Sequence, residues 1–270
     1  MDKIEYKSRF NFNRGQESTK KQLVLPILLA SLTGVVLGVC LLILFKSQAA
    51  QPIVETIPAP QAAAGQPANS VYGAAELPGV SLTVWQVGVF SEQAKVEQER
   101  TTLAQKGVTA VPRGTGPIHL FAGAAPDKKA GEALGTKLTE LKVNHFVKEY
   151  GITPLSGVIE GVPAADAKQI ERLLSQEVKI AEALLKADSA GGKALRDQWS
   201  ALAADAKTAG ESLVKGGQQE NAAALQLLHQ QLGEAAAAAH ENKGVLDVQG
   251  RLIQFFVSYE ILGAKLVKIR

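Results

Sequence analysis

The sequence predicts an α+β protein with a single transmembrane helix, a disordered linker, a βαββαβ module with a four-stranded antiparallel sheet, and a C-terminal all-α helical bundle. Three observations lead to this fold class. An uncharged apolar run occupies residues 23–45, strand and helix patterns alternate over 81–150, and helical periodicity extends over 151–270. The composition adds a limit on partners. A net charge of +3, from 29 basic and 26 acidic residues, is too weak to indicate nucleic acid.

The apolar run from Leu23 to Phe45 carries no charged side chain. As a helix it would extend about 34 Å, enough to cross a bilayer hydrocarbon core of about 30 Å. Residues 1–22 form a basic tail, whereas Lys46 is followed by no further basic residue before Lys95. The positive-inside rule therefore predicts a single-pass protein of the cell membrane, with a cytoplasmic N-terminus and an extracytoplasmic C-terminal part.

A cleavable signal peptide and a lipoprotein anchor fit this run less well. A signal peptide would use the small residues SQAA at 47–50, but the apolar run is too long for its hydrophobic region. A lipoprotein would use Cys40, which lies deep in the run and follows Val39 where lipidation motifs have a small residue. Because Cys40 is the single cysteine, an intramolecular disulfide and a multi-cysteine metal site are excluded.

Residues 46–80 are rich in alanine, glutamine and proline and predict a flexible linker, because such a segment buries too little apolar surface to offset its ordering entropy. The module at 81–150 follows, and its elements are expected in the order strand, helix, strand, strand, helix, strand. The expected ranges are 82–90, 91–107, 108–113, 118–124, 127–141 and 143–150. Its halves resemble each other at a fixed offset, which pairs Gly88 with Gly123.

Both helices of such a module should lie on one face of the sheet and leave the other face open. Alternation along the first and third strands assigns residues to the two faces. The residues expected under the helices are Trp85, Val87, Val89, Ile118, Leu120 and Ala122. The residues expected on the open face are Gln86, Gly88, His119, Phe121 and Gly123.

Two stretches of the module resemble the halves of a SPOR (sporulation-related repeat) domain. VWQVGVF followed by SEQAKVEQERTTLAQKG is similar to the first half, with its V-Q-V-G-S-F strand, alanine- and leucine-rich helix and Lys-Gly exit. IHLFAGAAPDKKAGEALGTKLTEL resembles the second half. The sequence departs from the family at Val89, which replaces a serine, at Ala125, which replaces a phenylalanine, and at His119, which replaces a frequent basic residue.

The resemblance implies an RNP-like (ferredoxin-like) fold and binding to peptidoglycan, especially to glycan strands stripped of stem peptides at division septa. The open-face residues suit this ligand. Gln86 and His119 would hydrogen-bond sugar hydroxyl and acetamido groups, Phe121 would lie against a sugar ring, and Gly88 and Gly123 would admit close approach. Alternatives remain open for three of them: Gly88 as part of a bulge, Phe121 covered by the linker or the C-terminal region, and His119 as a solvent-facing residue without a role.

Residues 151–270 predict helical runs at roughly 164–188, 191–214, 218–242 and 244–268, separated by glycines. Apolar residues recur at spacings of three and four, as in coiled coils, and the short breaks between the runs favour antiparallel neighbours in a helical bundle. His229 and His240 do not have a metal-ligand spacing. The sequence therefore indicates no metal site, cofactor or catalytic residue.

Three functions are compatible with these features to different degrees. The first is a non-enzymatic, membrane-anchored protein that binds septal peptidoglycan and resembles the SPOR proteins of cell division and of stage II sporulation. The second is an assembly factor, in which the bundle binds a protein partner and the SPOR-like module is degenerate. The third is a cell-wall hydrolase, for which the sequence offers no catalytic candidate.

Overall fold

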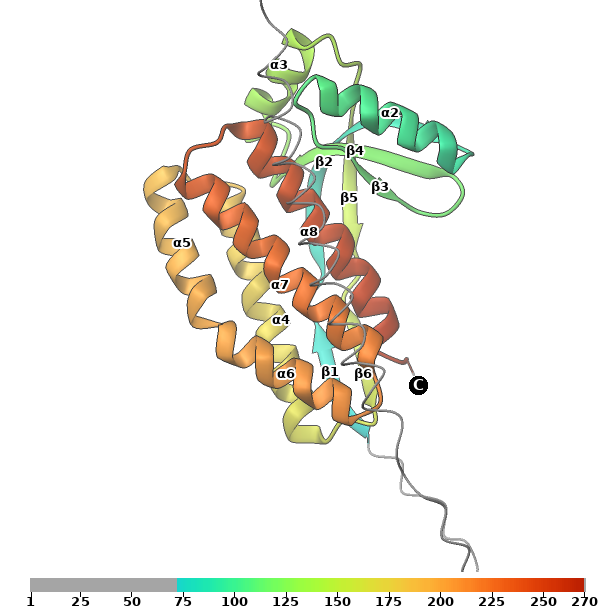
Figure 1. Ribbon diagram of the computed structural model, residues 1–270, viewed down its shortest axis with the longest axis vertical. Coiled ribbons are helices and arrows are strands. Elements are labelled where there is room, and N and C mark those ends of the chain that lie inside the picture. The colour runs from blue at the N-terminus through green and yellow to red at the C-terminus, as the bar shows by residue number, and fades with distance from the viewer. Residues whose placement is uncertain (1–71, 270) are drawn as a thin grey trace, which may run out of the picture. The chain divides into compact units, whose positions relative to one another are not determined.

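A computed structural model describes residues 72–269 (Figure 1). The strands are β1 (Tyr72–Leu77), β2 (Val80–Phe90), β3 (Val111–Arg113), β4 (Ile118–Ala125), β5 (Phe146–Ile152) and β6 (Leu155–Glu160). The helices are α2 (Gln93–Gln105), α3 (Glu132–Glu140), α4 (Ala164–Leu184), α5 (Ser189–Ala201), α6 (Ala203–Lys215), α7 (Gln219–His240) and α8 (Val245–Leu266).

The larger sheet is antiparallel and has the strand order β3-β4-β2-β5. Its strands are linked through α2 and α3 in the predicted order βαββαβ. Both helices pack on one face, where Trp85, Leu120 and Leu134 share an apolar core from which water is almost excluded. A four-stranded sheet with two helices on one face is therefore present in this part of the chain.

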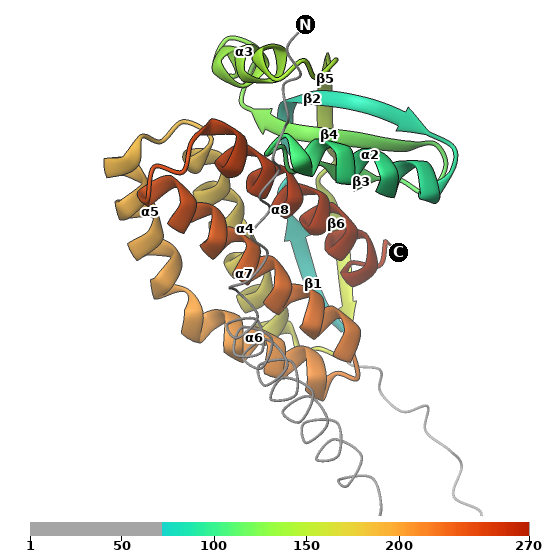
Figure 2. The same cartoon turned by 45° about the horizontal axis from the view of Figure 1, so that its top comes forward.

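The other face of this sheet was expected to be open, and this expectation is wrong. Helix α8 packs against β4 and β3 on that side and crosses beneath the sheet (Figure 2). The reason is the apolar character of the face: Val84, Phe121 and Tyr150 are 1%, 4% and 3% exposed and join one core with the helical bundle. Left uncovered, these side chains would form a contiguous apolar patch on the surface.

A hydrogen-bonded ion pair fastens α8 to the sheet. Arg113 donates from Nε and Nη2 to the two carboxylate oxygens of Glu260, at 2.8 and 2.6 Å, and its guanidinium lies 4.9 Å from the centre of the Tyr150 ring. The Tyr150 hydroxyl donates to the same carboxylate at 2.8 Å. The hydrogen bonds from Arg113, with that from Tyr150, lower the pKa of Glu260, while burial raises the pKa of Tyr150.

A second sheet joins the start and the end of the described chain. β1 and β6 pair antiparallel, and Lys268 forms an isolated bridge with Val158. Helix α4 packs on β1, and its buried apolar side chains, including Ile170, Leu174 and Val178 at spacings of four, face the bundle core. The sequence did not predict this sheet, because β1 lies in the segment assigned to the linker and β6 in the segment assigned to the bundle.

The predicted helical run 191–214 is two helices, α5 and α6, which meet at Leu202. The expected break at Gly191 and Gly192 is instead inside α5. Asp188 caps α5, since its carboxylate accepts the N–H of Gly191 at 2.8 Å. Gly192 permits close packing, because a Cβ there would lie 2.8 Å from the backbone of Ala239 in α7.

The predicted fold class therefore needs correction. The described residues form an α+β unit with seven helices and two sheets, in which the module and the bundle share a core. Within 72–269 there is no helix with the length and apolarity that a membrane crossing requires. The predicted tail at 1–22, the span at 23–45 and most of the linker at 46–80 lie outside the described residues.

The contact between Glu260 and Arg113 gives a pH-dependent prediction. Glu260→Gln should lower the free energy of unfolding near neutral pH by about 1 to 2 kcal/mol, a value reduced for the partial exposure of both side chains. Because the pKa of Glu260 is lowered by folding, its stabilisation is present above the ordinary value of 4.5 and is lost as the pH falls through the folded-state value. The difference between the variant and the wild type should therefore shrink in acid.

Urea denaturation of both proteins across this pH range measures the difference. Asp197→Asn, which breaks an exposed ion pair with Lys193, is the control and should leave the free energy of unfolding nearly unchanged. A wild-type advantage over Glu260→Gln that stays constant into acid would contradict the assignment.

Candidate functional site

An irregularity in β2 changes which side chains reach each face of the larger sheet. Gln86 pairs with Phe121, but the register shifts before Gly88, which pairs with Leu120, and Val89 then pairs with His119. Directly paired residues in an antiparallel sheet point to the same side. Since strand side chains alternate with a period of two, a one-residue irregularity reverses the assignment beyond it.

Gly88 and Val89 are consequently exchanged relative to the prediction. Gly88 lies on the side of α2 and α3, and a Cβ there would meet the ring of Phe90 at 2.5 Å. Val89 was expected under the helices and is 48% exposed. Strand geometry therefore accounts for Gly88 better than close approach of a ligand does, because the missing side chain makes room for Phe90.

Two more residues predicted for the open face are buried. Phe121 is 4% exposed and packs edge-on against Tyr150, with ring centres 5.8 Å apart. Gly123 is buried as well, and a Cβ there would lie 2.9 Å from both Leu134 of α3 and Gln249 of α8. Neither residue can contact a ligand while α8 stays in place.

Gln86 and His119 do lie together on this face, outside the area that α8 buries. His119 Nδ1 and Gln86 Oε1 are 3.0 Å apart, and both residues are half-buried. Because the amide oxygen only accepts, Nδ1 carries the proton, and in the neutral imidazole Nε2 is then an acceptor. The amide nitrogen of Gln86 takes no part in this bond, so the pair offers a ligand both donors and an acceptor.

Strand β5 adds two residues beside this pair. Phe146 is the direct cross-strand partner of Gln86 and is 66% exposed, and Lys148 lies two residues further on the same side and is also exposed. We call the group Gln86, Val89, His119, Phe146 and Lys148 the sheet patch. Alternation along β5, counted back from Tyr150, is the signal that assigns Phe146 and Lys148 to this face. The sequence-based assignment covers only the first and third strands and therefore misses both residues.

A second polar group lies inside the bundle. Glu177 is fully buried, and its Oε1 lies 2.7 Å from Nδ1 of His229, which stacks on Trp199 with ring centres 4.9 Å apart. Burial raises the pKa of Glu177. The side chain of Trp199 also donates to the backbone oxygen of His229, so the group ties α4, α5 and α7 together.

The polar groups of the described chain do not form a metal centre. Over residues 72–269 no cluster of three or more His, Cys, Asp or Glu side chains is arranged to hold a metal ion. The sheet patch instead combines an amide, an imidazole, an exposed aromatic ring and an ammonium group. Such a set is suited to binding through hydrogen bonds and stacking.

Comparisons of the chain with protein-family models, with curated proteins and with solved structures found no match. The resemblance to SPOR domains thus stays a prediction, which rests on the motifs of 81–150.

The packing of Phe90 over Gly88 gives a stability prediction. Gly88→Ala should lower the free energy of unfolding by about 1 kcal/mol, because the new methyl group displaces the Phe90 ring. The loss should shrink when Phe90→Leu is present, since the smaller side chain leaves room for the methyl group. Urea denaturation of the two single variants and the double variant measures this coupling. Equal losses in both backgrounds would show that Gly88 and Phe90 do not interact.

Proposed function

We propose that the protein is a non-enzymatic binder of peptidoglycan glycan strands and that the sheet patch is its binding surface. One observation carries the proposal: the hydrogen-bonded Gln86 and His119 pair lies beside Phe146, an aromatic side chain that is 66% exposed. An exposed aromatic ring next to paired polar groups supplies the apolar face and the hydrogen-bonding groups that binding a sugar requires.

The chemistry of the patch fits a sugar chain. The ring of Phe146 offers a flat apolar surface for the C–H face of a hexose, and the amide and imidazole reach groups that both donate and accept hydrogen bonds. The ammonium of Lys148 would attract the lactyl carboxylate that a muramic acid carries once its stem peptide is removed. Because this carboxylate is free only on stripped strands, Lys148 would pair there with the glycan strand itself.

The proposal places the folded unit on the outer side of the cell membrane. The charge asymmetry around residues 23–45 predicts this side. Glycan strands would then reach the patch without any movement of α8, because the patch lies on the part of the sheet beyond that helix.

The experiment is co-sedimentation of the full chain, kept in mild detergent, with purified cell-wall sacculi. Phe146→Ala should weaken binding about fivefold to tenfold, the loss expected for one stacking contact. The fold should be preserved, because the side chain is largely exposed. Sacculi treated with an amidase to remove stem peptides should bind more of the wild-type chain than untreated sacculi.

Leu227→Ala is the matched control, since Leu227 is an apolar side chain of α7 that is 51% exposed and distant in sequence from the patch. It should bind as the wild type does. Equal binding by Phe146→Ala would show that the patch is not the site. Release of soluble muropeptides by the wild-type chain would instead favour the hydrolase.

A further inference from the structure

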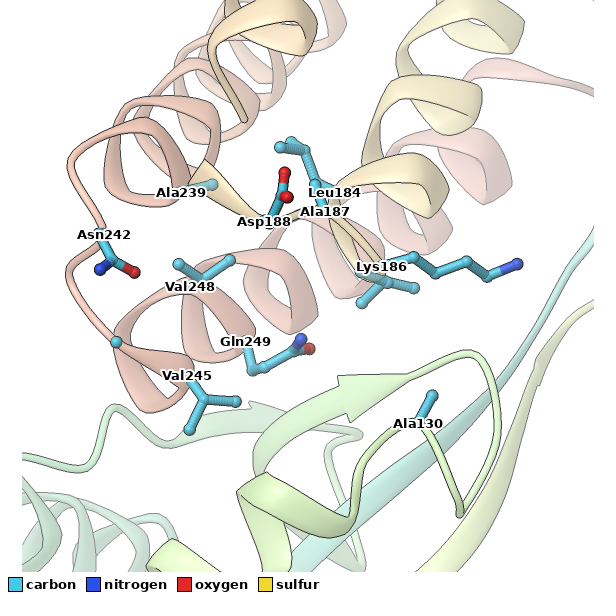
Figure 3. A pocket seen from close by; sticks show the side chains of 12 residues that line it. Ala130, Leu184, Lys186, Ala187, Asp188, Ala239, Asn242, Val245, Val248 and Gln249 are labelled. Carbon is cyan, nitrogen blue, oxygen red and sulfur yellow. The ribbon is translucent and has the colours of Figure 1, made fainter. Parts of the chain in front are cut away.

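A cavity of about 470 Å³ lies where the ends of the bundle helices meet the segment before α3. The α4–α5 connection contributes Lys186 and Asp188, the α7–α8 connection contributes Asn242, and Ala130 stands opposite (Figure 3). Because one water molecule takes about 30 Å³, the space is far larger than a single water or ion requires. It falls within the range of about 300 to 1,000 Å³ that is usual for small-molecule sites.

Gln249 points into this cavity from the first turns of α8 (Figure 3). The residue is 8% exposed, and its Oε1 is buried without a hydrogen-bond partner. The Cβ of Gln249 packs closely on Gly123, because a Cβ built on Gly123 would lie 2.9 Å from it. A buried amide oxygen left without a donor costs stability, whereas a leucine of similar size would not.

The walls of the cavity indicate what the amide would bind. Leu184 and Val248 give an apolar lining, while Asp188 and Lys186 place opposite charges at the exposed rim. The carboxylate of Asp188 keeps acceptor capacity beyond its bond to Gly191. A half-turn about the last torsion of Gln249 exchanges its oxygen and nitrogen, so the amide can accept a hydrogen bond from the cavity or donate one.

We propose that this cavity binds a short peptide with free amino and carboxyl ends. One peptide group, the C=O or the N–H, would pair with the Gln249 amide, the ammonium with Asp188 and the carboxylate with Lys186. A small apolar side chain would contact Leu184 and Val248. The cavity and the sheet patch share no residue, so this proposal stands or falls independently of glycan binding.

Isothermal titration calorimetry of the full chain with L-alanyl-L-alanine tests the proposal. We expect saturable binding to the wild type, weakened about fivefold to tenfold in Gln249→Leu by the loss of one buried hydrogen bond. N-acetyl-L-alanyl-L-alanine, which lacks the ammonium, should also bind more weakly. Gln231→Leu is the matched control, because Gln231 is a second buried glutamine with an unpartnered oxygen but does not line the cavity.

A second variant tests the cavity independently, in case Gln249→Leu does not fold. Ala130→Trp changes an exposed residue at the cavity wall and should block entry of the dipeptide. The substitution keeps the hydrogen bond from the backbone N–H of residue 130 to the carboxylate of Asp127. The proposal is overturned if the wild type shows no saturable heat up to about 10 mM dipeptide. It is also overturned if Ala130→Trp, or a folded Gln249→Leu, binds as tightly as the wild type. Sacculus binding should be the same in all of these variants.

Discussion

The docking of α8 on the larger sheet is the contact on which the arrangement of the rest depends. The sheet is apolar on both faces, so two short helices on one side cannot bury it alone. Helix α8 supplies the second cover, and the carboxylate of Glu260, bound by Arg113 and Tyr150, fixes its position. Since α8 also packs on α7, the same contact joins the sheet to the bundle.

This docking also determines where a ligand can bind. Over Phe121 and Gly123 the sheet is closed, so a site there would require α8 to leave and a large apolar surface to meet water. Beyond the helix, Gln86 and His119 remain at the surface, and Phe146 and Lys148 of the neighbouring strand lie beside them. The candidate site therefore lies beside α8, and not over Phe121 and Gly123 as the sequence predicted.

Local patterns predicted the strands and helices of the module because alternation and turn residues act over a few residues. They placed Gln86 and His119 on the correct face. They assigned Gly88 to the wrong face, but the alternative that Gly88 is part of a bulge is confirmed by the register shift between Gln86 and Gly88. They also missed β1 and β6, because the pairing of these strands joins segments far apart in the chain. They did not predict that α8 covers the sheet, because this depends on tertiary contacts between distant residues.

Hydrogen–deuterium exchange of the full chain, measured with and without peptidoglycan glycan chains freed of stem peptides, shows where glycan binds on the larger sheet. We expect glycan to bind beside α8 while the helix stays docked. Exchange should slow in segments 86–90 and 146–149 and stay unchanged across 245–266. Faster exchange in α8 together with slower exchange around Gly123 would contradict this expectation, because it would show that the ligand binds the face that α8 covers.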